Sequence, residues 1–177
     1  MVKKILLTFL ILSLFVFSFW FFLPKKNLYY ELEHLLYEQG IVIENETLSE
    51  HPFSLEITDA DLYFQGIKVA KISSLSINIT LLFNSLHAKD IHCANIAKTF
   101  IPTRIESVDI NYNIIKPLFV SITAYGEFGK LNGGANIKQR KGAIQLKPSK
   151  LMEQKYKKLL YKLKKTQGGA YSYVKNF

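Results

Sequence analysis

The chain has 177 residues, with 23 Lys and Arg against 14 Asp and Glu and a formal net charge of +9. This length suffices for one ordinary domain with its own core and not for two, and the single cysteine, Cys93, excludes an intramolecular disulfide. The charge is uneven, because residues 130–177 contain 13 of the 23 basic residues and only one of the 14 acidic residues. A near-neutral body therefore precedes a strongly basic C-terminal quarter.

The first predicted element is an apolar helix over residues 5–23, which contain no charge, proline or glycine. At about 1.5 Å per residue the segment spans roughly 28 Å, close to the hydrocarbon thickness of a bilayer. Backbone groups in lipid must be hydrogen-bonded within the segment, which favours a helix. We predict a transmembrane helix at 5–23 after a cytoplasmic stub at 1–4. A cleaved signal peptide and a buried soluble helix are the alternatives, and the lack of an A-x-A-like cleavage site favours the uncleaved anchor.

Lysines flank both ends of this segment, at residues 3 and 4 and at residues 25 and 26, so they do not fix its orientation. The very short segment before it favours an N-terminus in the cytoplasm. The predicted location is a bacterial inner membrane, crossed once, with the C-terminal domain in the periplasm.

A short amphipathic helix is predicted over residues 25–40. Its apolar residues recur at helical spacing and are Leu28, Leu32, Leu35 and Leu36. Asn27 is a favoured N-cap and Gly40 a favoured residue after a helix end. We expect this helix to be a stalk whose leucines pack on the domain.

From residue 41 the apolar period changes to two, as in Leu75, Ile77 and Ile79, which alternate with polar residues. Such alternation predicts roughly eight to ten half-buried antiparallel strands over residues 41–147. Turn-forming residues at 58–61, 65–66, 132–134 and 141–142 separate them. The predicted fold class is mainly β, with a curved meandering sheet that forms an open groove or half-barrel.

We expect the apolar face of this sheet to line the groove. The candidate lipid-contacting residues are Leu55, Ile57, Leu75, Ile77, Ile79, Ile110, Val120 and Ile122.

A basic amphipathic helix and a last strand are predicted over residues 148–177. Ser149 is a plausible N-cap, and apolar residues from Met152 to Leu163 recur at helical spacing. The candidate residues for contact with an anionic surface are Lys155, Lys157, Lys158, Lys162, Lys164 and Lys165. That surface is phospholipid or lipopolysaccharide in one interpretation and a protein in another, while a merely solvated lysine face is the third. Nucleic acid is not an expected partner.

The sequence contains no recognisable catalytic motif, so we predict a protein that is not an enzyme and needs no cofactor. The spacing of His87, Asp90, His92 and Cys93 does not match that of a structural zinc site, and no metal is predicted. Asp59 and Asp61 could share a strand face, although ordinary turn chemistry explains them better.

The stretch 57–93, ITDADLYFQGIKVAKISSLSINITLLFNSLHAKDIHC, resembles the repeating unit of AsmA-like envelope proteins and of type II secretion system protein N. The matching features are Leu62 and Phe64, the strand at 75–79 and the pair Leu81-Leu82. The plan is also similar to that of the lipopolysaccharide-transport protein C. These resemblances imply a membrane-anchored periplasmic sheet with an apolar channel and no catalytic residues.

Two functions are therefore expected. In the first, the sheet binds acyl chains and handles envelope lipid. In the second, the chain is a structural component of a secretion or competence machine, and partner proteins bind at the edges of the sheet.

Overall fold

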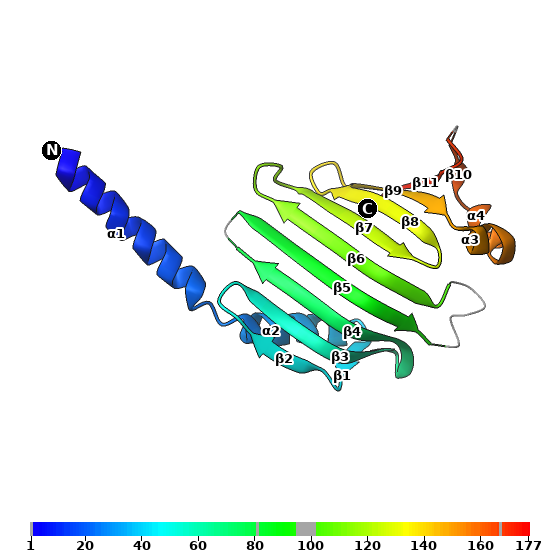
Figure 1. Ribbon diagram of the computed structural model, residues 1–177, viewed down its shortest axis with the longest axis horizontal. Coiled ribbons are helices and arrows are strands. Elements are labelled where there is room, and N and C mark those ends of the chain that lie inside the picture. Colours follow the sequence, from blue (N-terminus) through cyan, green and yellow to red (C-terminus); the bar gives the residue numbers. More distant parts are fainter. Residues whose placement is uncertain (1, 81, 95–101, 167) are drawn as a thin grey trace.

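The structure, a computed structural model, describes residues 2–80, 82–94, 102–166 and 168–177, with only the backbone at 19 and 20. Leu81, half of the leucine pair noted above, lies outside these residues. Figure 1 shows a long helix that projects from one end of a large twisted sheet, and short helical segments at the other end. The helices are α1 (Val2–Phe21), α2 (Lys25–Glu38), α3 (Lys150–Lys155) and α4 (Lys157–Leu160).

The described residues form eleven strands in one open antiparallel sheet. The strands are β1 (Ile41–Glu44), β2 (Thr47–Glu50), β3 (Ser54–Phe64), β4 (Ile67–Ile79), β5 (Phe83–Cys93), β6 (Arg104–Asn113), β7 (Phe119–Gly126), β8 (Gly129–Asn136), β9 (Lys141–Pro148), β10 (Lys164–Lys165) and β11 (Tyr171–Asn176). Their order is β1-β3-β4-β5-β6-β7-β8-β9-β11-β10, and β2 also pairs with β3. The prediction of a mainly β antiparallel protein is confirmed.

The two faces of the sheet differ because directly paired residues on neighbouring strands point to the same side. Leu86 of β5 pairs with Ile110 of β6, which pairs with Ile122 of β7. The next residue of β5, His87, pairs with Asp109 and lies on the opposite face. Period-two alternation thus produces one apolar and one polar face.

Three predicted turns fall on strand residues instead, and one of them, 141–142, begins β9 directly after the turn at 137–140. Residues 58–61 belong to β3, where Asp59 has a φ of 58° and the strand continues without reversing. Residues 132–134 belong to β8, where a Cβ on Gly134 would lie only 2.6 Å from the Phe119 ring. Glycine is needed there for close approach of an aromatic ring on the neighbouring strand, and not for a turn.

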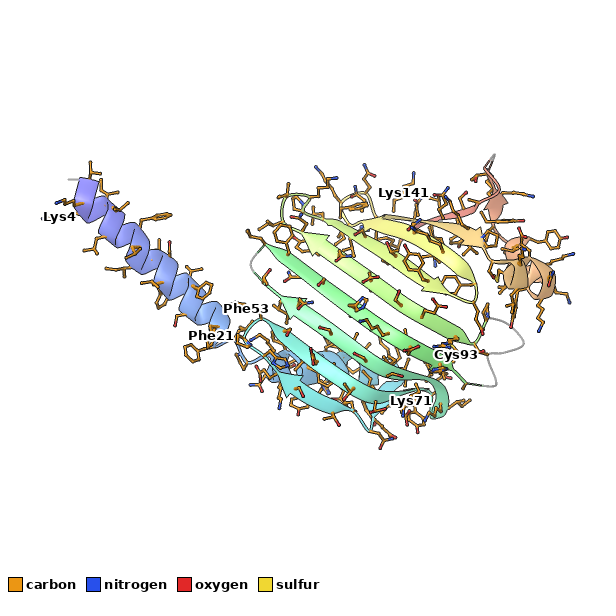
Figure 2. All side chains as sticks on the ribbon, in the orientation of Figure 1. Lys4, Phe21, Phe53, Lys71, Cys93 and Lys141 are labelled. Atoms are coloured by element: carbon orange, nitrogen blue, oxygen red, sulfur yellow. The ribbon has the colours of Figure 1, made fainter. Side chains whose placement is uncertain are left out.

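The described side chains of α1 are exposed to the surroundings. Within the described part of the chain, no helix combines the length and the apolar character needed to cross a membrane. The transmembrane helix at 5–23 therefore stays a prediction. Where α1 meets the sheet, the Phe53 ring lies 5.7 Å from that of Phe17 and 6.3 Å from that of Phe21 (Figure 2).

The single basic helix predicted after residue 148 is wrong. Ser149 does cap α3, because its Oγ accepts a hydrogen bond from the Met152 N–H at 3.1 Å. Helix α3 ends at Lys155 with Tyr156 as its C-cap, α4 follows, and the chain extends into β10. On either side of this break, Met152 and Leu160 are buried together against Leu146 of β9.

Candidate functional site

Two clusters of buried side chains cover the apolar face near its two ends. At one end Tyr29 of α2 packs on Leu55, Ile57 and Ala60 of β3. At the other end Met152 of α3 and Leu160 of α4 pack on Leu146 of β9. The register places Ile57 and Leu146 in one row of paired residues across the sheet, so both clusters lie on the same face.

The strands between these clusters carry apolar side chains that belong to neither. We call this part of the face the open apolar strip, and its residues are Leu86, Ala88, Val108, Ile110, Ile122 and Ala124. Among the described residues of β5, β6 and β7, only the two alanines are buried, and the larger residues of the strip are half-buried. An apolar sheet face is normally buried against another layer. The described residues therefore cover the middle of this face less completely than its two ends.

The eight predicted groove residues divide into three groups. Leu55 and Ile57 are each 1% exposed beneath Tyr29, so the prediction that they line an open groove is wrong. The half-buried residues Leu75 and Ile77 pack against that cluster.

The other four predicted residues are half-buried, and three of them lie on the central strands. Ile110 and Ile122 are in the open apolar strip, Val120 is beside it on β7, and Ile79 ends β4. The sequence prediction omitted Leu86, although its alternation with the polar neighbours Ser85 and His87 would have identified it. In the structure it pairs with Ile77.

The helix α2 rests on the sheet through an unexpected face. Leu28, Leu32 and Leu35 are 47%, 45% and 55% exposed, so the predicted leucine contact is wrong except at half-buried Leu36. Lys25 and Tyr29 are buried instead. The Lys25 N–H donates to Glu50 Oε1 of β2 at 2.8 Å, which ties the start of the helix to the sheet, and the Lys25 Nζ donates to the Leu23 carbonyl at 3.0 Å.

The exposed leucines of α2 lie on the flank that faces away from β1. The opposite flank, which includes His34 and Tyr37, lines a recess together with Ile41 and Val42 of β1. Successive residues of a helix are about 100° apart, so the three exposed leucines lie on the other side, toward the middle of the sheet.

A separate apolar cavity of about 600 Å³ lies where α1 meets the sheet. It is lined by Leu12, Ser13, Val16 and Phe17 of α1 and by Phe53, Thr80, Leu82 and Phe83 of the domain. This cavity joins the exposed surface of α1 to the end of the sheet where β4 turns into β5.

The six candidate lysines of residues 155–165 are all exposed. None forms an ion pair with a residue that the structure describes. Lys165 Nζ lies 5.9 Å from the centre of the Tyr171 ring, within the range of a cation–π contact. The segment that carries these lysines lies at the end of the sheet remote from α1 (Figure 1). The amino-acid sequence alone did not predict this position.

The polar residues of β5 are dispersed. His87 Nδ1 pairs with Asp109 on the polar face, whereas Asp90 accepts a hydrogen bond from Arg104 at 2.9 Å, which raises the Arg104 pKa. Burial raises the pKa of the Cys93 thiol. Within the part of the chain that the structure describes, no group of three His, Cys, Asp or Glu could bind a metal.

Several titratable groups near α2 have displaced pKa values, among them Asp61 and Tyr29. Lys68 Nζ lies 2.7 Å from Asp61 Oδ2, and its hydrogen bond lowers the Asp61 pKa, with a smaller contribution from Asn45. Burial raises the pKa of Tyr29, and the negative charge of Glu46 raises it further. These shifts reflect packing around α2, and none lies in the open apolar strip.

Comparisons with protein families, with characterised proteins and with solved structures found no match to this chain. The resemblance of residues 57–93 to AsmA-like proteins therefore stays a prediction.

Proposed function

We propose that this chain is a non-enzymatic, membrane-anchored protein of the bacterial cell envelope that binds lipid acyl chains on its open apolar strip. The observation that carries the proposal is the half-buried row of Leu86, Ile110 and Ile122 between two covered ends of one face. A kinship with AsmA-like or secretion-type proteins is part of the same proposal.

An acyl chain suits this surface better than a polar ligand does. The floor of the strip contains small residues, Ala88 and Ala124, and Gly133 pairs with Ile122 at its margin. These small side chains lie among larger apolar ones, so the strip offers apolar contact area and no directional polar partner. Burial of each CH₂ group contributes about 0.8 kcal/mol, so a chain lying across several strands gains several kcal/mol without any directional contact.

The proposed anchor is α1. Residues 5–23 carry no charge, and the described side chains of this helix are exposed. A helix that is apolar around its whole circumference is suited to a lipid environment rather than to water. With this anchor, the domain belongs on the periplasmic side of an inner membrane, and phospholipid or lipopolysaccharide supplies the acyl chain.

Retention of lipid by matched variants tests this proposal. Ile110→Gln places an amide in the strip, whereas Asn111→Gln places the same side chain on the opposite face of the same strand. The full chain is purified in detergent and washed, and the remaining lipid is quantified by mass spectrometry. We expect retained lipid to fall in Ile110→Gln and to be unchanged in Asn111→Gln, because only the first polar group enters the strip.

Thermal unfolding of both variants provides the control for folding. Equal lipid retention by two folded variants would contradict binding on the strip.

A second candidate function, assembly with a partner protein through a sheet edge, is favoured by β11. Its residues Tyr171–Asn176 pair with β9 on one side, but β10 covers only Tyr171 and Ser172 on the other. An uncovered edge can accept a strand of another protein. Hydrogen exchange at Tyr173–Asn176 that is slower in native membranes than in lipid vesicles containing only the purified chain would favour this function; equal rates would exclude it.

A further inference from the structure

The hairpin tips at one end of the sheet form a surface beside α1. The turns of β4–β5, β6–β7 and β8–β9 all lie at this end, because Ile79 pairs with Asn84, Tyr112 with Val120 and Asn136 with Lys141. The C-terminus joins them, since the Phe177 N–H donates to the Arg140 carbonyl at 2.9 Å. Figure 1 shows α1 leaving the molecule from the same end. We call residues 82–83, 113–119, 136–141 and 174–177 the hairpin-tip surface.

Large apolar side chains of the hairpin-tip surface are exposed. They are Leu82, Phe83, Ile114, Ile115, Leu118, Phe119, Ile137, Val174 and Phe177. Ile115 is the most exposed of them, at 75%. Scattered exposed apolar residues are normal, but a contiguous group at several adjacent turns marks an interaction site.

Unpaired cations accompany these apolar residues. The five cations of the surface are exposed, and they are Lys116, Lys138, Arg140, Lys141 and Lys175. The same segments contain no Asp or Glu, and none of the five cations forms an ion pair with a described residue.

Cations near the opposite end of the sheet differ, because several of them face carboxylates. Lys68 lies 2.7 Å from Asp61, and Lys71 lies 3.0 Å from Asp59. Positive charge at the hairpin tips is therefore available to an external anion.

We propose that the hairpin-tip surface lies in the headgroup region of an anionic bilayer. The apolar tips enter the interface, and the five cations contact lipid phosphates, as in other peripheral membrane surfaces that combine both residue types. The bilayer is the one that contains α1, so this inference rests on the proposed anchor. It also orients the sheet, with its strands ending at the membrane and the six lysines of residues 155–165 pointing away.

This orientation supplies an entry route for an acyl chain. The apolar cavity beside α1 is lined by Leu82 and Phe83 of the hairpin-tip surface. Ile79, Asn84, Tyr112 and Val120 form the next row of paired residues toward the same end, and Asn84 interrupts its apolar side chains. A chain leaving the bilayer would thus meet mostly apolar side chains between the cavity and the open apolar strip.

Matched labels on the full chain test the proposed contact. In a Cys93→Ser background, a fluorophore is attached at Ile115→Cys on the hairpin-tip surface or at Ile67→Cys, an isoleucine 52% exposed at the opposite end of the sheet. The protein is reconstituted in vesicles of phosphatidylcholine and phosphatidylglycerol that contain a lipid-attached nitroxide quencher. We expect quenching at 115 to exceed quenching at 67 by at least about two-fold.

Charge reversal then tests which cations contact the lipid. We expect Lys138→Glu, Arg140→Glu and Lys141→Glu together to reduce quenching at 115 by at least about two-fold, and Lys155→Glu, Lys157→Glu and Lys158→Glu to leave it unchanged. Equal quenching at 115 and 67 would overturn the proposal, and so would an effect of the second triple variant alone. Protection of the 115 label from an aqueous quencher without lipid quenching would mean that another copy of the chain covers the tips, which also overturns it.

These experiments distinguish failure of acyl-chain binding on the strip from failure of bilayer contact at the hairpin tips. If acyl chains bind on the strip and the tips do not contact lipid, lipid retention still depends on Ile110 while quenching at 115 equals that at 67. If the anchor is wrong, the chain does not incorporate into vesicles, and both labels stay unquenched.

Discussion

The side chain of Tyr29 attaches α2 to the sheet. It is 4% exposed in the cluster with Leu55 and Ile57, whereas the next residue, Tyr30, is 52% exposed. Removal of a buried aromatic ring leaves a cavity, so we expect Tyr29→Ala to lower the free energy of unfolding by about 3–5 kcal/mol. Tyr30→Ala should change it by less than about 0.5 kcal/mol. Urea denaturation followed by circular dichroism measures both, and equal effects would contradict the assigned packing of α2.

Asp61 should make stability depend on pH under acid conditions. Its pKa is lowered in the folded protein by the hydrogen bonds from Lys68 and Asn45, while the unfolded chain titrates near pH 4. The folded state therefore binds fewer protons, and the stabilisation present above about pH 4 is lost as the pH falls through the folded-state pKa.

Asp61→Asn removes this titration. We therefore expect the unfolding free energy of the variant to fall less steeply than that of the unaltered chain between about pH 5 and about pH 2, a range that includes the unfolded pKa of about 4. Denaturation at stepwise pH measures both slopes. Parallel slopes would show that Asp61 titrates alike in the folded and unfolded states.

For individual residues, the alternating pattern predicts which side chains share a face of the sheet, but not which of them a helix covers. Leu55 and Ile110 both fit the alternating pattern, yet only Leu55 lies beneath Tyr29. The difference depends on where α2 rests, and the hydrogen bond from the Lys25 N–H to Glu50 ties the start of α2 to β2. A lysine on the packing face of a helix contradicts the usual expectation for charged residues, so the pattern of leucines was misleading.

Among the elements, α3 depends on its N-cap. Ser149 Oγ accepts from the Met152 N–H and also donates to the Glu127 carbonyl, linking the helix to the β7–β8 turn. We expect Ser149→Ala to lower the unfolding free energy by about 1–2 kcal/mol, and the exposed strand residue Ser49→Ala to have almost no effect. Thermal unfolding measures the stability of both variants. A Ser149→Ala variant as stable as the unaltered chain would contradict the assigned cap.

In the C-terminal elements, the features set by the local sequence could be predicted, whereas the helix break could not. Ser149 and the later strand β11 follow from capping preference and alternation. The break at Tyr156 does not follow from them, because apolar spacing from Met152 to Leu163 fits an unbroken helix equally well. Similarly, Asp59 bends β3 without ending it, since the strand regains its pairing with β4 immediately afterwards.

At the scale of the whole molecule, the structure separates two basic regions that sequence alone treats as one C-terminal quarter. Lys138, Arg140 and Lys141 lie at the hairpin tips on the side of α1, and residues 155–165 lie at the far end. Antiparallel register produces this separation, because alternate turns of a meander are at opposite ends of the sheet. The same register brings the residues of the open apolar strip together from three strands.

Acyl-chain binding on the open apolar strip is tested most directly by photocrosslinking. The full chain is placed in vesicles that contain a phospholipid with a photoreactive group on its acyl chain. Peptide mapping by mass spectrometry locates the adducts. The account predicts adducts on the apolar residues of β5, β6 and β7, including Leu86, Ile110 and Ile122, in addition to those on α1. Adducts confined to α1, with the central strands unmodified, would contradict it.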